Sequence, residues 1–101
     1  MELIINEKNT TKLDKQLMEL GFEPCYRGFN YLNVAIQIIR QDREYLYNVT
    51  KKLYPEIAKA CNCSNHIKVE RCIRHLKNNS PFKLYTNSVL IGKLELMTRE
   101  D

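Results

Sequence analysis

One stretch, residues 54–78, constrains the fold most, because its pattern predicts two helices joined by a tight turn. Pro55 stands where a helix can begin, since the first helical position does not use its N–H. Asn62 tolerates the left-handed backbone of a turn. Ser64 or Asn65 can then cap the second helix. The stretch therefore predicts a helix-turn-helix.

The second predicted helix, about residues 66–78, is amphipathic. At about 100° per residue, Arg71 and Arg74 lie on one arc, one turn apart. The opposite arc is apolar and is expected to face the core, so the two arginines are expected to point into solvent. A helix that reads bases in the major groove of DNA needs such outward donors. The apolar arc consists of Val69, Cys72, Ile73 and Leu76.

Helix-turn-helix spacing supports this interpretation in part. It requires apolar residues at the fourth and eighth positions, a small residue at the fifth and a bend-tolerant residue at the ninth. The later apolar positions fit only if the turn is one residue longer. A plain helical hairpin with a solvated charged face also fits, because motif matches include false positives. The early positions are met by Ile57, Cys61, Ala58 and Asn62.

Two runs within this stretch, LYPEIAKACN and VERCIRH, are similar to a known family. They resemble the C-terminal DNA-binding effector domain of the sporulation master response regulator of endospore-forming bacteria. In that family the second run forms the recognition helix. The likeness extends over most of residues 13–78. Three differences lie at Cys61, where an aromatic residue is usual, at Cys72, where alanine is usual, and at Lys68, where arginine is common.

Glu70, Arg71 and Arg74 are the candidates for contacts with bases. Arginine can donate two hydrogen bonds to guanine, and a carboxylate can accept one from cytosine. The resemblance implies the same role, because the three residues match base-contacting positions of the family. An alternative for Glu70 is a salt bridge to Arg74, four residues further on. Phosphate contacts, which set affinity without reading sequence, are expected from Lys51, Lys52, Lys59, Lys68 and His75.

The cysteines and histidines around the turn form a candidate zinc site. Their spacing differs from that of a zinc finger, and Cys61 and Cys72 fall on apolar faces, where cysteine acts as a small hydrophobe. We therefore predict no metal and no cofactor. No acid is placed to orient a Cys–His pair and no Gly-rich phosphate loop exists, so we predict no enzyme. The candidates were Cys61, Cys63, His66, Cys72 and His75.

Helical periodicity also extends beyond the central stretch, and no strand-like alternation is evident. We predict an all-α fold of about five to six helices. The first helix is expected to start at a cap on Thr11 and to end at Gly21. Others are expected at about residues 29–41, 42–53 and 87–98. In the 29–41 helix, a polar face opposes the apolar stripe. In the last helix, the predicted buried stripe is Leu90, Leu94 and Met97.

Composition describes an ordinary globular chain of 101 residues, with 28% charged and 44% hydrophobic residues. This length fits one domain, in which residues 1–10 form a polar lead that is either frayed or packed on the body. The net charge of +4 suits a polyanionic partner but is common among other proteins. No signal peptide or membrane span is evident, so a cytoplasmic location with free thiols is expected.

These features predict sequence-specific binding to double-stranded DNA and regulation of transcription. The resemblance further implies a homodimer on DNA and contact with RNA polymerase. It also implies no control by phosphorylation within this chain, which has no room for a receiver domain. The alternative is a protein-interaction module that pairs with a full-length regulator and antagonises it without reading DNA. The longer turn and the shortened region at residues 77–81 favour that alternative.

Overall fold

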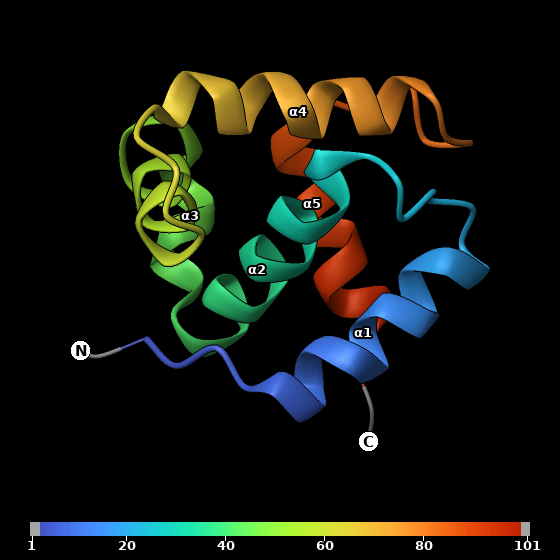
Figure 1. Ribbon diagram of the computed structural model, residues 1–101, viewed down its shortest axis with the longest axis horizontal. Coiled ribbons are helices and arrows are strands. Elements are labelled where there is room, and N and C mark those ends of the chain that lie inside the picture. Colours follow the sequence, from blue (N-terminus) through green and yellow to red (C-terminus); the bar gives the residue numbers. More distant parts are fainter. Residues whose placement is uncertain (1–2, 100–101) are drawn as a thin grey trace.

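The computed structural model describes residues 3–99, and every regular element in that range is a helix (Figure 1). This confirms the all-α prediction. A 3-10 helix, Arg43–Tyr47, and one π-helical segment, Val49–Leu53, lead from the second α-helix into the third. The α-helices are α1 (Glu7–Glu19), α2 (Arg27–Gln41), α3 (Tyr54–Ala60), α4 (His66–Asn78) and α5 (Asn87–Met97).

Helix α2 forms the centre of the fold and contacts all four other α-helices. In Figure 1 it lies between α3 and α5, with α4 across one end and α1 along the opposite side. The strong apolar stripe of this helix faces the core, where its members Leu32, Ala35 and Ile36 are fully buried. At 15 residues α2 is the longest helix. Among residues 3–99, no helix is both long and apolar enough to cross a membrane.

Helices α2 and α4 are in close contact at Gly28. A Cβ atom at this position would lie 2.1 Å from the carbonyl oxygen of Cys72 and 2.6 Å from its carbonyl carbon. Only glycine leaves room for a backbone at that distance. The start of α2 therefore fixes the position of α4 over the rest of the molecule.

The predicted polar face of α2 is partly buried, because α1 packs on it. The Asn33 amide donates to the Thr10 carbonyl oxygen at 3.0 Å and to the Asp14 carboxylate at 2.6 Å. The Gln37 amide donates to the Thr10 hydroxyl at 2.7 Å. Buried amides need such partners, since an unpaired one costs free energy. These contacts fix how α1 lies on α2.

Helix α1 begins before the predicted cap at Thr11, and that prediction was wrong. The side chain of Asn6 caps the helix, while the Thr11 hydroxyl donates to the Glu7 carbonyl oxygen. The lead before Asn6 packs on the body: Ile4 and the Gln41 side chain exchange hydrogen bonds of 2.9 and 2.6 Å. The first two residues of the predicted lead lie outside the described part of the chain.

The predicted helix over residues 42–53 is not one continuous α-helix. Asp42 is extended and accepts the N–H of Glu44, which starts the 3-10 helix. Asn48, with φ −149°, then ends the 3-10 helix before the π-helical segment begins. Val49 and Leu53 are nonetheless buried. These breaks in the helix change the direction of the chain, so that α3 packs against α2.

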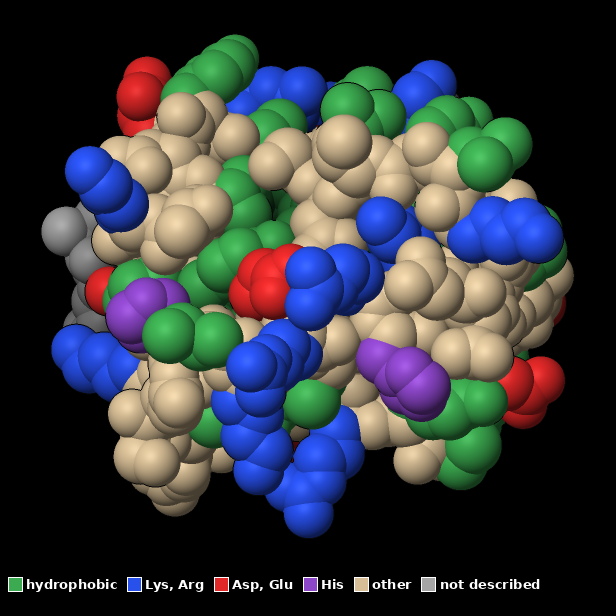
Figure 2. Space-filling view, turned by 90° about the horizontal axis from the view of Figure 1, so that it is seen from above, with side chains coloured by type: hydrophobic (Ala, Val, Ile, Leu, Met, Phe, Trp, Pro, Cys, Tyr) green, Lys and Arg blue, Asp and Glu red, His purple; other side chains and the backbone are tan. Residues whose placement is uncertain are grey.

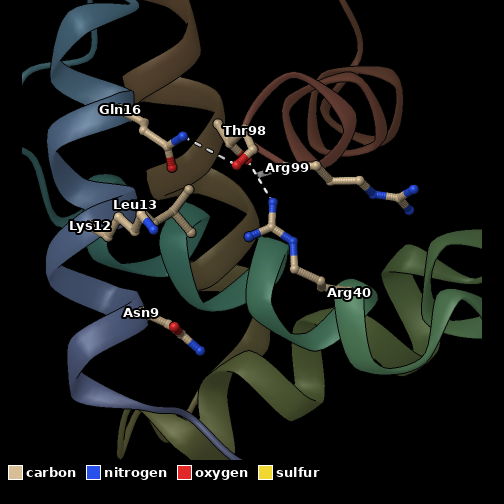
Figure 3. A pocket seen from close by; sticks show the side chains of 7 residues that line it. All are labelled: Asn9, Lys12, Leu13, Gln16, Arg40, Thr98 and Arg99. Atoms are coloured by element: carbon tan, nitrogen blue, oxygen red, sulfur yellow. Dashed lines mark hydrogen bonds between the residues drawn. The ribbon is translucent and has the colours of Figure 1, made fainter. Parts of the chain in front are cut away.

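The C-terminal end of α5 is tied to both α1 and α2 (Figure 3). Arg40 donates to the Thr98 hydroxyl at 2.7 Å, and Gln16 donates to the Thr98 carbonyl oxygen at 3.2 Å. These contacts border a polar hollow of about 400 Å³. The predicted burial of Met97 was wrong: it is 53% exposed, and Ile91 joins Leu90 and Leu94 in the core instead.

Beside this hollow, one buried carboxylate binds three arginines. The Glu95 side chain has no exposed surface, and it pairs with Arg40 at 3.3 Å and Arg43 at 3.2 Å as well as with Arg99. The hydrogen bonds from Arg99, followed by those from Arg40, lower the pKa of Glu95, although burial opposes them. The carboxylate is therefore held in its charged form.

Acidification is expected to destabilise the fold through Glu95. A carboxyl whose pKa is lower in the folded chain stabilises it fully above the unfolded pKa, near 4.5. That contribution is lost as the pH falls through the folded pKa. Urea unfolding at about pH 6 and about pH 3 measures the loss. Glu95→Gln should lose less stability over the same interval; an equal loss would mean that other groups cause the acid effect.

Candidate nucleic-acid interface

Helix α4 occupies the range predicted from the sequence, His66–Asn78. Of the two candidate caps, the structure selects Asn65, whose side chain accepts the N–H of Ile67 at 2.9 Å. Asn62 adopts the left-handed conformation, with φ 54°, as the turn requires. The turn thus sets both the start and the direction of α4.

The two faces of α4 differ as predicted. Val69 and Ile73 are fully buried, while Arg71 and Arg74 are exposed. Figure 2 views the molecule from the side on which α4 lies, and lysine and arginine side chains gather near the middle of this face. A histidine lies to either side of that group. The outer face of α4 is therefore mainly basic.

The carboxylate of Glu70 forms an ion pair with Arg74, with an N–O distance of 3.4 Å. This is the arrangement that the sequence left open as an alternative to base contacts. The two side chains are 32% and 55% exposed, so water screens the pair. Pairs of this kind contribute about 0.3–0.5 kcal/mol. A ligand with two well-placed partners can separate them at small cost.

The candidate phosphate contacts divide into two groups. Lys68 and His75 are exposed on α4 beside the arginines. Lys51, Lys52 and Lys59 lie on the π-helical segment and α3, separate from α4 in the chain. The Nζ atom of Lys52 is 5.1 Å from the ring centroid of Tyr45, and Lys59 borders a groove beside the N-terminal lead. Only the first group lies on the same helix as the candidate base-reading residues.

A groove of about 330 Å³ lies where the start of α2 meets α4. The edge of the Tyr26 ring meets the His75 ring there, with centroids 5.1 Å apart. Arg27, exposed at the first position of α2, borders the same groove and adds a cation beside α4. Sequence reasoning missed Arg27, although the glycine that follows it was a usable sign of close packing. The groove is lined by Tyr26, Arg27, Gly28, Arg71, Cys72 and His75.

Two polar contacts support α4 from below and behind. The Asn87 amide donates to the Tyr54 hydroxyl at 3.1 Å and to the Glu70 carbonyl oxygen at 3.5 Å, which joins α3, α4 and α5. Near the end of α4, the Nζ atom of Lys77 donates to the Tyr85 carbonyl oxygen at 2.7 Å. Burial raises the pKa of Tyr54, so its hydroxyl stays protonated as a hydrogen-bonding group. These hydrogen bonds thus attach α4 to α3, to α5 and to the loop that precedes α5.

The cysteines and histidines near the turn do not form a metal site. Within residues 3–99, no group of three or more Cys, His, Asp or Glu side chains is placed to hold a metal ion. All four cysteines are free thiols. Cys61, Cys63 and Cys72 are half-buried around the turn, while Cys25 is exposed in the loop before α2.

A family model described as "Sporulation initiation factor Spo0A C terminal" matches residues 13–80. The match runs from within α1 to just beyond α4, so it includes the whole helix-turn-helix. It confirms the resemblance seen in the sequence. The family is a DNA-binding domain of transcription regulators, which also confirms that the chain is no enzyme. The chain therefore belongs to the family of the C-terminal domain of sporulation initiation factor Spo0A.

Proposed function

We propose that this chain recognises a specific site in double-stranded DNA by placing α4 in the major groove. The observation that supports this most is the exposure of Arg71 and Arg74, one turn apart, on a helix whose opposite side is buried. A helix so anchored presents its guanidinium groups without exposing its own core. This is the arrangement that direct reading of base edges requires.

The three residues proposed to contact bases differ in the contacts that they make in the free protein. Among residues 3–99, the Arg71 side chain has no hydrogen-bond or ion-pair partner, so its donors are available to guanine at no internal cost. Arg74 and Glu70 must first leave each other. Arg71 is therefore the residue expected to contribute most to recognition.

Phosphate contacts complete the proposed interface. Lys68 and His75 flank the base-reading residues on α4, and Arg27 approaches from the far side of the groove. Cations on both sides of a helix in the groove can reach the two DNA strands. Lys51, Lys52 and Lys59 stay candidates for more distant phosphates, and pairing on DNA and contact with RNA polymerase stay predictions.

Arg71→Ala is expected to weaken binding to the preferred duplex by roughly 1–3 kcal/mol and to relax specificity, because a bidentate contact to a base is lost. The preferred duplex is first selected from a random library. A gel shift then compares it with a scrambled duplex at one salt concentration. Lys15→Ala on α1 removes one positive charge away from α4 and is the matched control.

Two outcomes would contradict the proposal. One is that Arg71→Ala distinguishes the two duplexes as well as the unchanged protein does, in which case α4 does not read bases through Arg71. Alternatively, binding to DNA could be insensitive to salt. Contacts with phosphates release counterions, so affinity should fall steeply as salt is raised. Salt-insensitive binding to a protein partner instead would favour the interaction module.

A further inference from the structure

The groove where the start of α2 meets α4, called the α2–α4 groove below, has an apolar floor. Gly28 has no side chain, and the half-buried Cys72 lies against it with its backbone. The volume of about 330 Å³ is at the lower end of the range for small-molecule sites, about 300–1,000 Å³. The groove therefore suits only a small ligand.

One wall of the α2–α4 groove is aromatic. The rings of Tyr26 and His75 both line it, with centroids 5.1 Å apart and planes at 86°. Tyr26 is partly buried against the core. Its backbone N–H donates to the Glu23 carbonyl oxygen at 3.4 Å, and its carbonyl oxygen accepts the Phe29 N–H at 3.0 Å. This wall is thus held in place, and a flat aromatic ligand packs well against such rings.

Two arginines border the α2–α4 groove without a partner. Arg27 and Arg71 are exposed, and within residues 3–99 neither side chain forms a hydrogen bond or an ion pair. No residue that lines the groove is acidic, and the first turn of α2 holds no acid. Glu70, next to Arg71 in the chain, is paired with Arg74 instead. The groove therefore favours an anion. A guanidinium binds a carboxylate through two parallel hydrogen bonds and also stacks on aromatic rings.

We propose that the α2–α4 groove binds small aromatic carboxylates, with the ring against Tyr26 and His75 and the carboxylate on Arg27 and Arg71. Phosphate contacts with DNA use only the cations, so they leave the aromatic wall and the apolar floor without a role. The bases of a duplex are stacked inside it and present no free ring to the groove. A flat ring with one negative charge uses all three features.

A bound aromatic acid also competes with DNA, an effect that rests on the proposed function. Arg71 is the residue expected to contribute most to base recognition, and its guanidinium cannot bind a carboxylate and a guanine at the same time. The ligand also occupies Arg27, a proposed phosphate contact. We therefore expect DNA binding to weaken as the concentration of the aromatic acid rises.

The first test is a titration of the whole protein with benzoate, followed in amide NMR spectra. Chloride is exchanged for benzoate, so that the ionic strength stays constant. Ligands of this size bind weakly, so the titration extends to about 20 mM. We expect saturable shifts of the amide signals of Arg27, Gly28 and residues 71–75, while the signals of α5 serve as the reference. Without saturable shifts at the groove, or with equal shifts along the whole chain, the proposal is wrong.

Two analogues of benzoate separate the charge from the ring. Benzamide has the same shape without the charge and should bind about tenfold more weakly, because a hydrogen bond to a charged group is lost. Cyclohexanecarboxylate keeps the charge without the flat ring and should bind about threefold more weakly. Equal affinity for benzoate and either analogue would overturn the proposal, because the groove would then not select aromatic acids.

Arg27→Gln tests the charged side of the groove. It should weaken benzoate binding roughly fivefold, because one of the two guanidinium groups is lost. Lys15→Gln removes one positive charge from α1, away from the groove, and should leave the affinity unchanged. If the two variants bound benzoate equally well, Arg27 would not hold the carboxylate.

Tyr26→Leu tests the aromatic wall and keeps an apolar side chain there. Benzoate should bind about threefold more weakly to this variant, while the affinity for cyclohexanecarboxylate should stay the same. This comparison separates the loss of a ring contact from a general disturbance of the groove. Equal losses for both ligands would contradict a specific role of the Tyr26 ring.

The last arm measures DNA binding in the presence of benzoate, again at constant ionic strength. At about ten times its dissociation constant, benzoate should lower the affinity for the preferred duplex roughly tenfold, whereas benzamide at the same concentration should lower it far less. Unchanged DNA binding by the benzoate-saturated protein would refute the competition. If the protein bound no duplex at all, the proposed function would fail, while the NMR titration would still decide whether the groove binds aromatic acids.

Discussion

Gly28→Ala is expected to destabilise the fold by about 3 kcal/mol, at the upper end for an overpacked contact. The new Cβ would lie 2.1 Å from the Cys72 carbonyl oxygen, and the obstacle is backbone that cannot rotate aside. Helices α2 and α4 would have to separate, which also moves Arg71. Chemical denaturation followed by circular dichroism measures the change.

Gly92→Ala is the matched control, since it makes the same substitution inside α5. Its Cβ would lie 3.2 Å from the Leu46 Cδ2 atom, the end of a flexible side chain. Alanine also favours a helix over glycine by about 1 kcal/mol. We expect a change near zero. Equal losses for the two variants would show that the approach of α2 to α4 is not specially tight.

Glu95→Ala is expected to cost about 2–3 kcal/mol. Breaking a fully buried ion pair costs about 3–5 kcal/mol. Here the side chains of Arg40, Arg43 and Arg99 are 34%, 44% and 50% exposed, so water can partly replace the lost carboxylate. The attachment of α5 to α2 should weaken most. Hydrogen exchange of the last turn of α5, together with urea unfolding, measures both effects.

Glu19→Ala provides the comparison, because Glu19 is exposed at the end of α1. Surface substitutions of this kind change stability by less than about 0.5 kcal/mol. If both variants lost the same small amount, the buried position of Glu95 would not matter. If Glu95→Ala lost stability only at low salt, screened surface attraction would account for the effect.

Helix α4 was predicted with correct bounds because its ends are encoded locally. The Asn65 cap, the left-handed Asn62 and the apolar stripe all lie within the same short stretch. Each acts through neighbours in the sequence, so no knowledge of the rest of the fold is needed. The exposure of Arg71 and Arg74 followed from the same stripe.

Predictions elsewhere were wrong where distant contacts decide the outcome. Asn6 starts α1, and the lead before it is held by Gln41, far along the chain. The burial of Asn33 and Gln37 depends on α1 covering that face of α2, which a helical pattern does not reveal. The helical pattern correctly placed the polar side chains on one face of α2. It does not show which helix packs on that face, because that depends on tertiary contacts.

In the candidate site, too, some features follow from the local sequence and others depend on distant contacts. Periodicity alone placed Arg71 and Arg74 on the outer face of α4, but Arg27 lies beside that face only because α2 and α4 touch at Gly28. The free thiols were expected from the sequence, because the spacing of the cysteines and histidines differs from that of a zinc finger.

If Glu70 and Arg74 contact bases as proposed, the ion pair between them makes neighbouring base positions depend on each other. Separating the two side chains costs about 0.3–0.5 kcal/mol once, whether one or both then find a base. A DNA target that contacts only one of these two side chains still requires the ion pair to break, and it gains only one new contact in return. The binding free energies of single and double base changes in the target should therefore be non-additive by about this amount. A position weight matrix, which treats positions as independent, would then misjudge the affinity of sites that match at only one of the two positions.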